Sequence, residues 1–135
     1  MLDTTAHETA PPPLSTRFIP FTHVQKRDGR AAPYDRDRIA HAIEMAFRAE
    51  SGTPYPDAID IAIHDAVERV TGAVEDALSA AHGAAGRIGI EQIQDEVERQ
   101  LMAAGHFTVA RRFIVYRETR ARGRAERRIR LTEAD

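Results

Sequence analysis

The chain has 135 residues, 42% of them hydrophobic and 30% charged, so length and composition predict one folded domain rather than a disordered chain. It contains no cysteine, which excludes disulfide frameworks, zinc ribbons and iron–sulfur clusters. The formal net charge of -2 gives no overall attraction to nucleic acid, and neither a membrane span nor a signal peptide is present, so we expect a cytoplasmic protein without membrane contact.

The two ends of the chain differ in composition from its middle. Residues 1–17 combine a run of three prolines with threonine and serine and show no periodic apolar pattern, which predicts a disordered leader. Residues 123–135 are rich in arginine and have little to bury, so we interpret them as a linker that continues the last helix. The folded domain is therefore expected over residues 18–122.

A β-hairpin is predicted at the start of this domain. An extended segment over residues 21–27 leads into Asp28-Gly29, a dipeptide typical of a two-residue hairpin turn. Residues 30–34 return as the partner strand. Pro33 places that strand at an edge of the sheet or at its own end, because proline has no amide proton for a ladder bond.

Two helices and a short strand follow. Asp35 is a helix-capping residue just before an apolar pattern of helical period, and this helix is expected to end near Ser51-Gly52. A second start signal at Pro56-Asp57 precedes an apolar stripe that continues to about Ala81. Residues 87–90 are predicted to form a third strand.

Two more helices complete the predicted fold, which is of the α+β class. The third helix carries Ile93, Val97 and Leu101 on one face and ends at Gly105, a residue suited to a left-handed cap. The fourth helix has Thr108 as its expected cap.

The hairpin and the first helix together suggest an anion site. Lys26 and Arg27 precede the turn, and the free amides and partial positive charge of a helix start at Asp35 attract negative charge. Arg38 adds a guanidinium that can grip phosphate with two bonds. The alternative is that Lys26 and Arg27 only keep an edge strand soluble, although Lys26 is the one lysine among nineteen basic residues.

Catalytic and metal sites lack candidates. The six histidines are not spaced as metal ligands, and the adjacent Asp95 and Glu96 point about 100° apart on a helix. No phosphate-binding glycine loop occurs. A small nucleotide hydrolase or kinase therefore lacks its machinery, and a stand-alone helical interaction module that uses the arginine tail remains a further alternative.

Five segments in this order and spacing resemble the ATP-cone, a regulatory module at the front of many ribonucleotide reductases. They are Lys26-Arg27-Asp28-Gly29, residues 34–39, residues 93–97, residues 101–106 and residues 109–117. The resemblance covers residues 24–122. It implies a four-helix bundle capped by a small three-stranded sheet, with adenine nucleotide bound beneath the sheet.

The resemblance also implies a function and a set of site residues. The domain would bind ATP or dATP with Mg²⁺ as an allosteric ligand and control the overall activity of a reductase. Lys26 and Arg27 would meet the triphosphate and Val24 would line the adenine side. The remaining positions assigned to the nucleotide site are Ala32, Asp35, Arg38, Ile90, Gln94 and Arg120.

Implied partners are the catalytic domain of the same reductase, its radical-generating subunit and further copies of the chain in a nucleotide-dependent oligomer. A transcriptional repressor of reductase genes carries the same cone and is the alternative. Its zinc ribbon needs four cysteines, and this chain has none.

Four positions depart from the family's usual residues. Arg38 stands where lysine is frequent and Ala32 where an acidic residue is common. Ile90 and Gln94 stand where hydroxyl, imidazole or acidic side chains often face the nucleotide. Alanine and isoleucine offer few partners to a ribose hydroxyl, which predicts tighter binding of dATP than of ATP.

Overall fold

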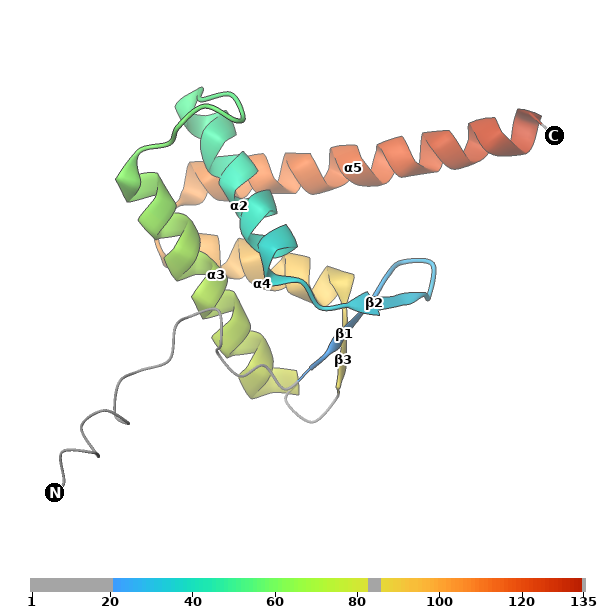
Figure 1. Cartoon of the computed structure of the whole chain (residues 1–135), viewed down its shortest axis with the longest axis horizontal. Coiled ribbons are helices and arrows are strands. Elements are labelled where there is room, and N and C mark those ends of the chain that lie inside the picture. The colour runs from blue at the N-terminus through green and yellow to red at the C-terminus, as the bar shows by residue number, and fades with distance from the viewer. Residues whose placement is uncertain (1–20, 83–85, 135) are drawn as a thin grey trace, which may run out of the picture.

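The computed structural model describes residues 21–82 and 86–134 and shows an α+β fold of four helices and one three-stranded sheet in that part of the chain (Figure 1). The predicted leader over residues 1–17 lies outside the described residues. In chain order the elements are β1 (His23–Gln25), β2 (Ala31–Pro33), α2 (Arg36–Ser51), α3 (Ile61–His82), β3 (Arg87–Gly89), α4 (Ile90–Ala103) and α5 (Phe107–Ala134).

The sheet has the strand order β2-β1-β3, with β1 antiparallel to β2 and parallel to β3. Pro33 therefore lies in an edge strand, as predicted. Val24 pairs with Ala32 on one side and Ile88 on the other, so these three residues share one face of the sheet. Because Ile88 is buried in the core and Val24 packs against it, this face is directed toward the helices.

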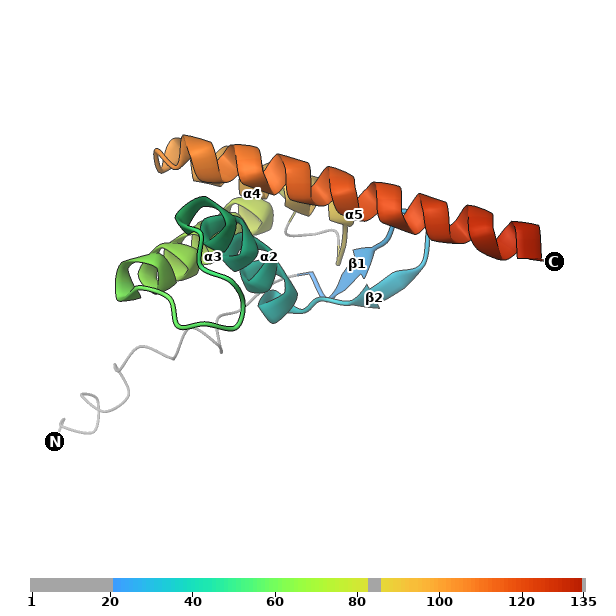
Figure 2. The same ribbon diagram turned by 90° about the horizontal axis from the view of Figure 1, so that it is seen from above.

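The helices pack around one core, in which α2 and α4 each contact both α3 and α5. Figure 2 shows α5 lying across α2 and α4. Ile93, Val97 and Leu101 are buried, which confirms the face predicted for α4. The core also contains Phe21, Ile39, Ile43, Phe47, Val67, Val70, Val74, Leu78, Ile88, Val109 and Phe113.

The first helix begins and ends where the sequence predicts. The Asp35 carboxylate accepts a hydrogen bond from the Asp37 amide at 3.0 Å, as an N-cap does. Gly52 ends α2 in the left-handed conformation, with φ 72°. Gly105, with φ 86°, follows α4 in the same way and confirms the stop predicted there.

The predicted start of the second helix at Pro56-Asp57 is wrong. The Asp57 amide donates to the Pro54 carbonyl at 2.9 Å in a turn, and α3 begins only at Ile61. Asp60 caps it instead, since its carboxylate accepts from the Ala62 amide at 3.3 Å.

The predicted cap of the last helix is also displaced. α5 already begins at Phe107, and the Ala110 amide donates to the His106 carbonyl at 2.9 Å, so Thr108 lies within the first turn. The helix then continues to Ala134 and extends beyond the other helices (Figures 1 and 2). No helix among the described residues is long and apolar enough to cross a membrane.

Candidate functional site

The loop between β1 and β2 presents the two cations expected to bind an anion. The Lys26 amide donates to the Arg30 carbonyl at 2.7 Å, and the Gly29 amide donates to the Lys26 carbonyl at 3.0 Å. Gly29 has φ 89°, and no described residue other than glycine has a positive φ. Arg27 and Asp28 are therefore the central residues of a turn that a left-handed glycine completes, and the predicted two-residue Asp28-Gly29 turn is wrong.

Asp28 folds back onto this loop. Its carboxylate accepts from the Arg30 amide at 3.0 Å and from Arg30 Nε at 2.8 Å. The hydrogen bond from the Arg30 amide holds the pKa of Asp28 below its usual range. Arg30 is thus paired with Asp28, which leaves Lys26 at the start of the turn and Arg27 within it as the other cations of the loop.

The hairpin loop lies beside the first turns of α4. Since β1 and β3 are parallel and Gln25 pairs with Gly89, both strands end at the same edge of the sheet. Arg27 Nη2 donates to Gln94 Oε1 at 3.2 Å, and Arg27 Nε lies 3.4 Å from Glu91 Oε2. Two predicted site residues that are 67 positions apart in sequence, Arg27 and Gln94, are thereby brought together.

Glu91 is a member of this group that the sequence analysis missed. It stands three residues before Gln94, on the same face of α4, and that spacing is the signal that could have identified it. A small cavity of about 280 Å³ lies beside Arg27 and Glu91, and residues of α5 form part of its lining. Its lining residues are Arg27, Glu91, Glu98, Ile114, Arg117, Glu118 and Ala121.

Arg117 is the second cation of that cavity and was also missed. Its Nη1 donates to Asp95 at 3.1 Å and to Glu98, so two carboxylates of α4 neutralise it. Arg120, which the resemblance assigned to the site, instead lies with its guanidinium 5.7 Å from the Tyr116 ring. Arg120 is not among the residues that line the cavity, and its assignment stays a prediction.

Asp35 and Arg38 lie together at the start of α2. Arg38 Nε is 3.8 Å from the Asp35 carboxylate, and both side chains are exposed. Asp35 already accepts from the Asp37 amide, so its carboxylate serves the helix start and attracts Arg38 at the same time. The guanidinium of Arg38 remains accessible to an anion from solvent.

A buried polar cluster connects this helix start to α3 and was not predicted. Tyr34 Oη donates to Glu75 at 2.6 Å, and Arg36 donates to Glu75 at 3.1 Å and to Glu68 at 3.3 Å. Glu75 is only 1% exposed, and Arg36 Nη2 is buried without a hydrogen-bond partner. Burial and the bond to Glu75 raise the pKa of Tyr34 well above its usual value.

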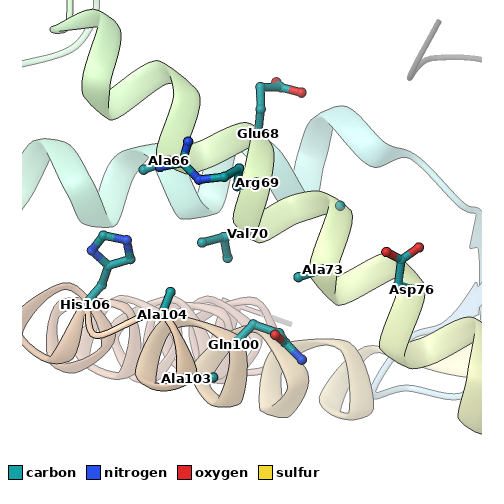
Figure 3. Close-up of a pocket in the computed structure, with 11 residues that line it drawn as sticks. Ala66, Glu68, Arg69, Val70, Ala73, Asp76, Gln100, Ala103, Ala104 and His106 are labelled. Carbon is teal, nitrogen blue, oxygen red and sulfur yellow. The ribbon is translucent and has the colours of Figure 1, made fainter.

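A larger groove of about 570 Å³ runs between α3 and α4 (Figure 3). Its lining is mainly small and apolar, with Ala66, Val70, Ala73 and Ala104 among its residues. None of the nine predicted site residues lines this groove. Arg69 is its only arginine, so it offers a polyphosphate less positive charge than the hairpin loop does.

The chain is similar in sequence to a known domain family and to part of several reductases. The family model described as the ATP cone domain matches residues 22–122. The ribonucleoside-diphosphate reductase subunit alpha of Chlamydia pneumoniae is 44% identical over 104 residues, which cover 76% of this chain and 10% of that protein.

Reductases with other names contain a similar segment. The anaerobic ribonucleoside-triphosphate reductase of Salmonella typhimurium is 34% identical over 80% of this chain and 14% of its own length. The vitamin B12-dependent ribonucleoside-diphosphate reductase of Mycobacterium tuberculosis is 36% identical over 73% of this chain and 12% of its own length. The chain therefore spans about a tenth to a seventh of the relatives it matches.

Proposed function

This chain belongs to the ATP-cone family of domains, and from that premise we propose that it senses adenine nucleotides for a ribonucleotide reductase. ATP or dATP, with Mg²⁺, is the proposed ligand. The bound nucleotide controls the activity of a catalytic domain and requires no covalent chemistry from the cone itself.

The observation that carries the proposal is the hydrogen bond between Arg27 and Gln94. It supports a site in which the cationic hairpin loop and the start of α4 close on one ligand. The amide of Gly89, the N-cap of α4, donates to Gln92 Oε1 at 2.8 Å, but Gly89 has no side chain to cap the amides that follow it, so those amides suit a phosphate oxygen.

The apolar residues beside the hairpin loop and the start of α4 suit the base and the sugar of a nucleotide. Val24 and Ala32 share the sheet face that is directed toward the helices, and Ile90 opens α4 next to that sheet. We propose that the sheet caps the helices over the nucleotide, with the triphosphate toward Lys26 and Arg27.

The proposed partners follow from the names of the relatives and from the coupling between nucleotide binding and assembly. A ligand shifts an equilibrium between two assemblies only if it binds them with different affinity. We therefore propose that ATP and dATP differ in the contacts that they permit with the reductase's catalytic domain, its radical-generating subunit or a second copy of the chain, in the cytoplasm.

Calorimetric titration of ATP into the chain tests the proposal. Lys26→Ala is expected to weaken ATP and dATP binding alike by about 1.5–3 kcal/mol, or roughly 10-fold to 150-fold, because a phosphate contact is common to both. Arg111→Ala, which removes an exposed cation from α5, is the control and should leave both affinities unchanged. Unchanged binding by Lys26→Ala would remove this lysine from the site.

The same titration measures the sugar preference. Because Ile90 and Ala32 offer a ribose hydroxyl no hydrogen-bond partner from their side chains, dATP is expected to bind more tightly than ATP. Ile90→Thr should narrow that preference by supplying a hydroxyl, and Ile90→Val is the matched control without one. A ratio of affinities that is the same in both variants would show that residue 90 does not face the sugar.

A further inference from the structure

Arg27 is paired with two acceptors of the protein itself. Its Nη2 donates to Gln94, and its Nε lies 3.4 Å from the Glu91 carboxylate. Both acceptors belong to one face of α4, three residues apart. A phosphate group that approaches Nε of this guanidinium therefore competes with the Glu91 carboxylate for the same positive charge.

We propose that Glu91 is a built-in competitor that lowers the affinity of the hairpin loop for polyphosphates. The inference rests on the proposed function and adds a residue that sets its affinity. Glu91 is 58% exposed and Arg27 is 36% exposed, so the pair is open to solvent and exchanges readily with an anion from solution.

Two electrostatic effects of Glu91 act in the same direction. Its carboxylate neutralises Arg27 before the ligand arrives, and it repels the phosphate groups after they arrive. The neighbouring Arg117 does not relieve this repulsion, since Asp95 and Glu98 already neutralise it. The carboxylate does not depend on Arg27 for its place, because the first turn of a helix favours negative charge.

The competition acts mainly on long phosphate chains. Only a ligand whose phosphates reach Arg27 gains when Glu91 is neutralised, and a longer chain carries more charge for Glu91 to repel. Glu91 therefore lowers the affinity for a triphosphate more than the affinity for a nucleotide with one phosphate.

Glu91→Gln in the full chain tests this inference, with ATP and AMP as calorimetric probes. We expect ATP to bind roughly threefold to tenfold more tightly, and AMP within about twofold of the wild-type affinity. A gain in affinity cannot arise from damage to the fold. Glu118→Gln is the matched control, because Glu118 lines the same cavity on α5 but is not one of the two residues bonded to Arg27.

A double variant shows whether the effect passes through Arg27. In an Arg27→Ala background, Glu91→Gln should lose most of its gain. Unchanged or weaker ATP binding by Glu91→Gln overturns the inference, as does an equal gain in Glu118→Gln. If wild-type chain fails to bind ATP, the proposed function fails as well, whereas ATP binding that Glu91→Gln does not strengthen overturns this inference alone.

Discussion

Tyr34 donates its phenolic proton to a carboxylate that has almost no contact with solvent. Its pKa is raised because burial and the bond to Glu75 both oppose ionisation. In the unfolded chain the same group ionises near its usual value of about 10. Below that pH both states are protonated, whereas above it only the unfolded state loses the proton, so this contribution to stability falls as pH rises.

Urea unfolding of wild-type protein and Tyr34→Phe checks this expectation. At about pH 8.5 the variant should be less stable by about 1–3 kcal/mol, since Glu75 loses a donor. At about pH 11 the difference should shrink, because only the wild-type stability has declined through ionisation of Tyr34 in the unfolded state. A difference that stays constant or grows with pH would contradict the assignment.

Some site residues could be predicted from the sequence, and others could not. Lys26 and Arg27 are recognisable because two adjacent cations at a hairpin turn are a local pattern in the sequence. Glu75 looks like any acidic residue on a helix until Tyr34 and Arg36 approach it from 41 and 39 positions away. Burial of a carboxylate depends on those distant contacts, so the sequence carries no local sign of it.

At the scale of elements, Gly29 fixes the shape of the hairpin loop. Its φ of 89° is strained for any residue with a Cβ, although no atom lies within 4 Å of where that Cβ would be. Gly29→Ala should therefore lower the free energy of unfolding by about 1 kcal/mol through the backbone alone, as measured by urea denaturation.

Gly105 provides the control for that substitution. It has φ 86° and equal space, but it lies at the far end of α4 from the hairpin loop. Gly105→Ala should cost similar stability, yet only Gly29→Ala should also weaken ATP binding, because only that loop carries Lys26 and Arg27. Equal ATP affinities in the two variants would contradict a role for the loop conformation.

Helix boundaries were predictable where one capping residue stands out in the sequence, and less so where two residues could serve as the cap. Asp35 and Gly52 bound α2 as predicted, since a cap and a left-handed glycine act within one turn of helix. For α3, Asp57 and Asp60 are equally good caps by residue type. The choice is made by the turn at Pro54, whose carbonyl also accepts from the buried Arg48 at 3.0 Å.

At the scale of the whole molecule, the charged site and the wider of the two described cavities lie in different places. The groove between α3 and α4 is wide but lined mainly by small apolar residues (Figure 3). The hairpin loop supplies Lys26 and Arg27, the start of α2 supplies Arg38, and the start of α4 supplies amides that its N-cap Gly89 does not cap with a side chain. Polyphosphate recognition depends on positive charge and amide donors, which favours the site at the hairpin loop over the groove between α3 and α4.

The sequence predicted which segments form the proposed nucleotide site but not which of their residues contact each other. The order hairpin, helix, strand, helix follows from turn signals and apolar periodicity. The parallel pairing of β1 with β3, which brings Arg27 to Gln94, joins residues too distant for any local pattern to indicate. The spacing of Glu91 from Gln94 is a local signal, but the contact of Glu91 with Arg27 depends on the same distant pairing.

Amide chemical-shift mapping of the ¹⁵N-labelled chain during titration with ATP and Mg²⁺ tests the location of the site most directly. We expect the largest changes on the amides of Lys26, Arg27 and Gln94, with smaller ones at the start of α2. Changes concentrated on Ala73 and Ala104 would place the ligand in the groove between α3 and α4 and contradict a site at the hairpin loop. An unchanged spectrum at millimolar ATP would contradict nucleotide binding altogether.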